Sequence, residues 1–219
     1  MKRNCFLLIA LLFTGLYLSA QQSGTINPPD AKKISKQLSK EPGLYSKLLK
    51  RYMDNDTTLT IENYHLIYYG YALQSGFDPN KTSSLRDSLT TLFRNANQGN
   101  ADYKSIKELS KRILEQLPFD IRTLDPAIYA YERSEDPVTA MKLQFRMGRI
   151  IETIFNSGDG QSQTSPFFIV SIPNIADMVR ALGFSLVSDS PETSGDLYFM
   201  RVKENEFGIQ GFYFRVFGR

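Results

Sequence analysis

The sequence predicts an α+β fold, with a layer of antiparallel helices over residues 30–158 followed by a small β-α-β-β-β sheet over residues 166–217. Two observations support this. Apolar residues recur at helical spacing up to Gly158. Beyond that glycine they form continuous or alternating runs, which are typical of strands. The length suits a single domain over residues 30–219.

Residues 1–20 are predicted to be a secretory signal peptide. Lys2 and Arg3 precede an apolar run from Cys5 to Leu18, and Leu18-Ser19-Ala20 resembles a cleavage site. The run is shorter than the roughly 20 residues of a membrane-spanning helix, so we expect no transmembrane segment in the mature chain. Cleavage would remove Cys5, the only cysteine, and leave 24 basic against 23 acidic residues. Such a balance gives no electrostatic case for nucleic acid as a partner.

Residues 21–29 are polar and contain Pro28-Pro29, so they are expected to form a flexible leader. Ile34 and Leu38 then mark a short amphipathic helix that Pro42-Gly43 ends. The next helix is indicated by the apolar residues Leu44, Leu48, Leu49 and Tyr52.

The aromatic stretch from Leu59 to Phe77 is predicted to be the central helix. Two apolar faces cover most of its circumference, one made by Tyr64, Ile67, Tyr68 and Tyr71 and the other by Leu66, Tyr69 and Leu73. Thr60 is the expected N-cap, and Gly70 is typical of a place where another backbone comes close.

Three Asp-Pro pairs predict helix starts, because proline is favoured at the first helical position. They are Asp78-Pro79, Asp125-Pro126 and Asp136-Pro137. Gly158 is the expected C-cap of the last long helix. The stretch from Asp125 to Ile154 is similar to one helical hairpin of tetratricopeptide type. An ordinary helix pair is the alternative, since such arrays need several stacked units.

After Gly158 the pattern is β-α-β followed by a hairpin. Phe167 to Ile172 and Phe184 to Val187 read as strands on either side of a helix between Asn174 and Gly183. Alternation in 198–202 and 212–216 predicts two strands joined through residues 204–208. The acidic residues between these strands are expected to lie in loops and at strand ends.

No residue is assigned a catalytic role, and neither a metal nor a cofactor is expected. His65 is the only histidine and is predicted to be packed and hydrogen-bonded inside the protein. Asp54 and Asp56 imitate a calcium loop, but Leu59 stands where glycine is needed.

The loop from Ser157 to Ser162 is the most distinctive polar segment. Its candidate binding residues are Ser157, Asp159, Gly160 and Ser162, whose oxygens and permissive backbone suit a ligand site between helices and sheet. A helix cap followed by a turn is the alternative interpretation.

Two motifs carry a resemblance to a known family. The run Leu66-Ile67-Tyr68-Tyr69-Gly70-Tyr71 and the later run Ile154-Phe155-Asn156-Ser157-Gly158-Asp159-Gly160, together with the signal peptide, resemble a family of exported bacterial proteins catalogued only as a domain of unknown function. The likeness extends over most of the mature chain. It implies export from a Gram-negative cell, to the periplasm or outside, and implies no catalytic residues.

Three functions are consistent with these features. We expect an exported, non-enzymatic binding or scaffold protein of the bacterial envelope, with an envelope protein or a glycan as the partner. One alternative is a hydrolase of glycans or peptides that uses carboxylates beside Asp159. The other is a glycan-binding module that uses exposed tyrosines of the central helix, namely Tyr64, Tyr68, Tyr69 and Tyr71.

Overall fold

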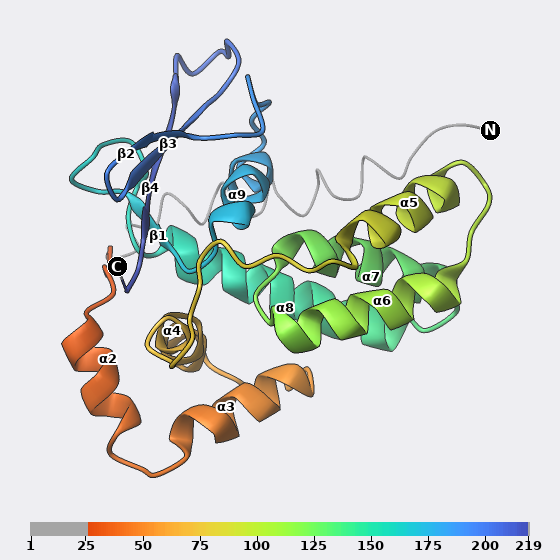
Figure 1. Cartoon of the computed structure of the whole chain (residues 1–219), viewed down its shortest axis with the longest axis horizontal. Helices are drawn as coiled ribbons and strands as arrows, with labels where there is room; N and C mark the ends of the chain where they lie inside the picture. The colour runs from red at the N-terminus through yellow and green to blue at the C-terminus, as the bar shows by residue number, and fades with distance from the viewer. Residues whose placement is uncertain (1–25, 219) are drawn as a thin grey trace.

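The computed structural model describes residues 26–218, so the predicted signal peptide lies outside the described part. Within these residues the helices come first and the sheet last, which confirms the predicted α+β class (Figure 1). The α-helices are α2 (Ala31–Leu38), α3 (Leu44–Met53), α4 (Ile61–Tyr71), α5 (Arg86–Asn97), α6 (Tyr103–Gln116), α7 (Ile121–Arg133), α8 (Pro137–Phe155) and α9 (Ile175–Ala181). A short 3-10 helix, η1 (Ile172–Asn174), precedes α9.

Short polar side chains start several helices by accepting hydrogen bonds from backbone N–H groups that have no partner within the helix. At α4 the Thr60 hydroxyl accepts from Asn63 N at 3.3 Å, and the Asn63 side chain accepts from Thr60 N at 3.2 Å. At α8 the Asp136 carboxylate accepts from Thr139 N at 3.1 Å, just before Pro137. The predictions of Thr60 as an N-cap and of Asp136-Pro137 as a helix start are confirmed.

The other two Asp-Pro predictions are wrong. Asp78 and Pro79 lie in a turn ahead of α5, where the Pro79 carbonyl accepts a hydrogen bond from Ile172 N at 2.9 Å. This turn therefore makes a contact with η1, which is distant in the sequence, and does not begin a helix. Pro126 lies inside α7, which already begins at Ile121 because its first turn is buried against the rest of the protein.

Gly158 is not the C-cap of α8, which ends at Phe155 with Asn156 as its cap. Glycine is required there for a different reason. A Cβ atom at Gly158 would lie 2.2 Å from the Pro166 carbonyl oxygen, so only a residue without a side chain fits.

The sheet has the strand order β1-β4-β3-β2, formed by β1 (Phe167–Ile169), β2 (Glu192–Ser194), β3 (Leu197–Arg201) and β4 (Gly211–Val216). β1 runs parallel to β4, and the other neighbours are antiparallel. The predicted hairpin is confirmed as β3 and β4. The predicted strand at Phe184–Val187 is wrong, since that segment makes only an isolated bridge between Leu186 and Val202. The second strand is instead β2, whose three residues are all exposed and polar and therefore give no apolar pattern.

α4 is the central helix, as predicted. Figure 1 shows it nearly end-on, close to α2, α3 and α8. Tyr64, Tyr68 and Tyr69 are among the largest fully buried side chains, and one hydrophobic cluster runs from α2 through α4 to the sheet. The close approach at Gly70 is made by a side chain, since a Cβ there would lie 2.8 Å from Leu38 Cδ1 of α2.

A second, smaller hydrophobic cluster joins α5, α6 and α7 away from the sheet. Its buried members are Leu89, Ala96, Ile106, Ile113 and Ala130. Among residues 26–218 no helix has both the length and the apolar character needed to cross a bilayer.

Candidate functional site

The loop after α8 uses its polar groups to join the helices to the sheet. Ser157 is buried, and its hydroxyl donates to the Ile154 carbonyl at 2.6 Å while accepting from Phe168 N at 2.8 Å. The first hydrogen bond is made to the C-terminal end of α8, and the second is made to the backbone of β1. Ser157 therefore connects two elements and presents no hydroxyl to solvent.

The remaining candidate residues of this loop form hydrogen bonds with nearby loop residues or with the sheet. The exposed Asp159 carboxylate accepts from Gln161 N at 2.8 Å, which is an Asx turn. Gly160 accepts from Tyr213 N at 2.7 Å through its carbonyl, which extends the pairing of β4. Ser162 accepts from Ser165 N at 3.2 Å. The geometry is that of a cap and a turn, the alternative interpretation of this segment.

The tyrosine hydroxyls of α4 reach the backbone of β1 and the residue that follows it. Tyr68 accepts from Val170 N at 3.2 Å, and Tyr69 donates to the Phe168 carbonyl at 3.2 Å. With Tyr64, these residues are at most 2 % exposed, so none of the three is available to a glycan, and the alternative of a glycan-binding helix finds no support in them. Burial raises the pKa of both Tyr68 and Tyr69 well above the usual range.

His65 is packed, as predicted, with its ring edge-on to Tyr69 at a centroid distance of 4.9 Å. Its Nε2 atom is buried and makes no hydrogen bond to any residue in the described range, so the expected hydrogen bond is absent at this atom. Burial, together with the charge of Lys33, lowers the pKa of His65.

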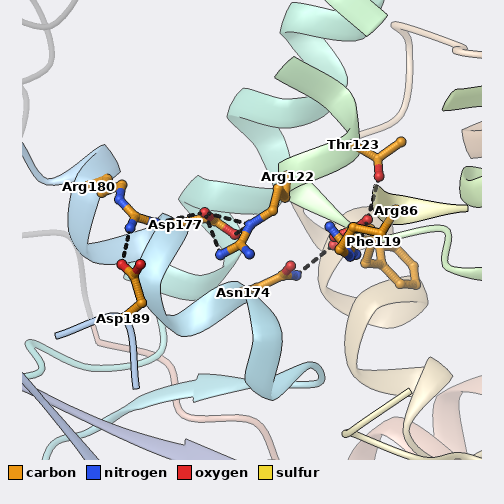
Figure 2. Close-up of polar contacts among 9 residues, drawn as sticks. Arg86, Phe119, Arg122, Thr123, Asn174, Asp177, Arg180 and Asp189 are labelled. Carbon is orange, nitrogen blue, oxygen red and sulfur yellow. Dashed lines mark hydrogen bonds and ion pairs between the residues drawn. The ribbon is translucent and has the colours of Figure 1, made fainter. Parts of the chain in front are cut away.

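A buried polar cluster lies where α5, α7 and η1 meet. Asp120 is 5 % exposed and accepts from Arg86 Nη2 at 2.7 Å and from the Thr123 hydroxyl at 2.5 Å. Figure 2 shows Arg86, Thr123 and Asn174 in this region, and Asn174 Nδ2 donates to the Phe119 carbonyl at 2.7 Å. The contacts tie η1 to the connection between α6 and α7.

A chain of ion pairs continues from this cluster along α9. Arg122 Nε lies 3.1 Å from Asp177 Oδ2, and Arg180 bridges Asp177 to Asp189 (Figure 2). Burial raises the pKa of Asp177, although the two arginines oppose this effect. The cluster and the chain together join the helical part to the sheet part.

The space beside Asp120 is too small for a substrate. It has a volume of about 20 Å³, enough for about one water molecule. Its lining includes Tyr71, Asp78, Lys81, Arg86 and Ser171. Among the described residues, no group of three or more His, Cys, Asp or Glu side chains is placed to hold a metal ion.

A larger hollow of about 240 Å³ lies at the connection between β3 and β4. The side chain of Asn205 organises this connection through four hydrogen bonds. Nδ2 donates to the Lys203 and Ile209 carbonyls at 3.0 and 2.7 Å, and Oδ1 accepts from Phe207 N and Ile209 N, each at 3.2 Å. The hollow is lined by Arg201, Val202, Glu204, Asn205, Gly208, Ile209 and Gln210.

Phe207 stands next to this hollow and is 69 % exposed, with one ring contact to Phe184 at 6.2 Å. The sequence predicts a turn here, as found, but does not predict the site. The available signal was an aromatic residue inside a short charged turn, Glu204-Asn205-Glu206-Phe207-Gly208. Asp159 lines neither this hollow nor the space beside Asp120.

A family model described as a domain of unknown function, DUF4919, matches residues 32–217. The chain belongs to this family. No curated protein and no solved structure matches the chain. The DUF4919 region begins within α2 and ends after β4, so it contains the Ser157–Ser162 loop, the Asp120 cluster and the β3–β4 connection.

Proposed function

We propose that this protein is a non-enzymatic binding protein exported to the bacterial envelope, and that it binds a partner protein through the β3–β4 connection. The observation that carries the proposal is Phe207, a large aromatic side chain that is 69 % exposed on a turn. Exposed aromatic residues are frequent anchors of protein interfaces because one ring buries a large apolar area.

The rigidity of the turn strengthens this interpretation. Asn205 bonds both to the Phe207 backbone and to the two sides of the connection, so the ring is presented from a fixed backbone. A preorganised anchor loses less conformational entropy on binding than a mobile one. The hollow next to it offers polar groups that a partner side chain can contact.

Site-specific photocrosslinking in the producing cell tests this site. Phe207 is replaced by p-benzoylphenylalanine, and the matched control carries the same group in place of Met141, which is 61 % exposed on α8. We expect one defined protein adduct at position 207 and not at position 141. Adducts that are identical at both positions, or none at 207, would contradict the proposal.

The identified partner is then purified and its affinity measured by calorimetry. Phe207→Ala is expected to weaken binding at least tenfold, in line with the loss of an interface anchor of about 2 kcal/mol. Asp159→Ala, in the loop after α8, is expected to bind like the wild type. The export part of the proposal is tested by the N-terminal mass of the protein from envelope fractions, which should correspond to a start at Gln21.

A further inference from the structure

Four exposed lysines gather on α2 and the turn that follows it, and we call them the α2 lysines. At about 100° per residue they lie within roughly a third of the helix circumference. The opposite side of α2 faces the core, where Ile34 is 1 % exposed and Leu38 packs against the hydrophobic cluster. The α2 lysines are Lys32, Lys33, Lys36 and Lys40.

Acidic residues do not neutralise these charges. Among residues 26–218 none of the α2 lysines forms an ion pair, whereas the neighbouring cations of α3 do. The whole N-terminal segment is basic, because residues 26–53 contain seven lysines and arginines against two acidic residues. Residues 54–218 have the reverse balance, with 16 basic against 21 acidic residues. The described chain thus separates its charge, with the positive part at α2 and α3.

An exposed apolar residue precedes α2 in the chain. Ile26 is 47 % exposed and lies five residues before Ala31, the first residue of α2. The adjacent backbone is fixed, since Asn27 N donates to the Asn156 carbonyl at 2.8 Å. Lysines with a neighbouring apolar side chain are the combination that holds proteins at the surface of anionic bilayers.

We propose that the α2 lysines and Ile26 bind the surface of an anionic phospholipid bilayer. Lysine is a flexible point charge that suits a diffuse layer of headgroups, whereas shaped anionic partners are usually recognised by the planar fork of arginine. Residues 31–40, which carry the α2 lysines, contain no arginine. The side chain of Ile26 can enter the boundary between headgroups and acyl chains. This surface is separate from the β3–β4 connection, so the inference does not depend on the partner proposed there.

Sedimentation of the purified, processed protein with lipid vesicles tests the proposal. We expect binding to phosphatidylcholine vesicles that contain roughly 30 % phosphatidylglycerol and no binding to phosphatidylcholine alone. Raising the salt from about 0.1 M to about 1 M should abolish binding, because screening shortens the reach of the charges. Replacing all four α2 lysines by glutamine should weaken binding by about 600-fold, at about fivefold per lysine.

The matched control removes four exposed lysines elsewhere, in the variant Lys81→Gln, Lys104→Gln, Lys111→Gln and Lys142→Gln. It has the same net charge as the α2 variant and should retain affinity within about fivefold. Equal loss in both variants would attribute binding to net charge and overturn the proposal. The proposal would also be overturned if the wild type did not bind anionic vesicles. Full competition by millimolar glycerol phosphate would overturn it too, because it would indicate a site for a single headgroup. Circular dichroism verifies that both variants are folded.

Discussion

Gly148 and Gly158 both belong to the α8 region, yet their surroundings differ. A Cβ at Gly148 meets no atom within 4 Å, whereas one at Gly158 would lie 2.2 Å from the Pro166 carbonyl oxygen. We expect Gly148→Ala to raise the free energy of unfolding by about 0.5–1 kcal/mol, because alanine favours the helix. Gly158→Ala should lower it by about 1–3 kcal/mol through overpacking. Urea unfolding measures both, and changes of the same sign would contradict this.

Arg146 is a buried cation, 2 % exposed, that no sequence pattern distinguishes from a surface arginine. It stacks on the Tyr52 ring at 4.0 Å and donates from Nη2 to the Pro118 carbonyl at 2.7 Å. Both contacts come from distant segments, which explains why its burial could not be predicted. Arg146→Ala should lower the free energy of unfolding by about 2–4 kcal/mol.

The control for Arg146 is Arg149, which is partly exposed and pairs with Glu152 at 2.7 Å. Arg149→Ala should cost less than about 1 kcal/mol, as expected for a surface ion pair. Thermal or urea unfolding of the two variants measures the loss of stability that each substitution causes. Similar losses in both would show that the buried contacts of Arg146 contribute no more than a surface pair.

His65 should make stability depend on pH near neutrality. Burial lowers the pKa of His65 in the folded protein below its usual value of about 6.5, so the unfolded chain binds the proton first as pH falls. The free energy of unfolding should therefore decrease between about pH 7.5 and pH 5.5, by at most about 1.4 kcal/mol per pH unit.

His65→Gln should flatten this dependence, and the sequence contains no other histidine to replace it. Urea unfolding at several pH values measures the difference between the two chains, in which carboxylates common to both largely cancel. A parallel pH dependence in wild type and variant would show that His65 is not responsible.

At the scale of elements, α4 protects an edge of the sheet. β1 pairs with β4 along one side, and on α4 Tyr68 accepts a hydrogen bond from Val170 N at 3.2 Å. Tyr68→Phe leaves that buried N–H without its acceptor and should lower the free energy of unfolding by about 1–3 kcal/mol. Amide exchange at Val170 should become faster. Tyr71→Phe is the control, because Tyr71 is only partly buried. In this control variant the Val170 amide should exchange at the wild-type rate.

The sequence predicted the elements whose own residues determine them. α4 and α8 have helical apolar spacing together with local caps, and the β3–β4 hairpin has strict alternation, so these three are found. β2 was missed because its strand forms only by pairing with β3 and buries none of its own residues. The start of α7 was placed too late because burial of Ile121 decides it.

The candidate sites were less predictable than the fold. The glycines and serines of 157–162 have the composition of a binding loop, but their hydrogen bonds are directed within the loop and toward the sheet. Phe207 was missed because its importance lies in its exposure, which is a property of the folded chain. Local pattern indicates which groups are present, and only packing indicates which of them remain available to a partner.

For the whole molecule, the two proposed surfaces lie far apart. In Figure 1, α2 is drawn at the lower left and the connection between β3 and β4 at the top, beyond the sheet. A protein held at a bilayer through α2 would therefore present the β3–β4 connection away from the lipid. This arrangement predicts that the protein can bind the membrane and the partner protein at the same time.

Two labelled variants test this orientation. Ile26→Cys and Phe207→Cys, each with Cys5→Ser, are labelled with a dye whose emission shifts to the blue in apolar surroundings. On addition of anionic vesicles the emission of the label at position 26 should shift to the blue, because this position enters the boundary of the acyl chains, whereas that of the label at position 207 should not. A shift at position 207 alone, or at both positions, would show that the molecule does not lie on the bilayer through α2. An unshifted label at 207 leaves this surface open to water, where a second protein can reach it while the first surface stays bound.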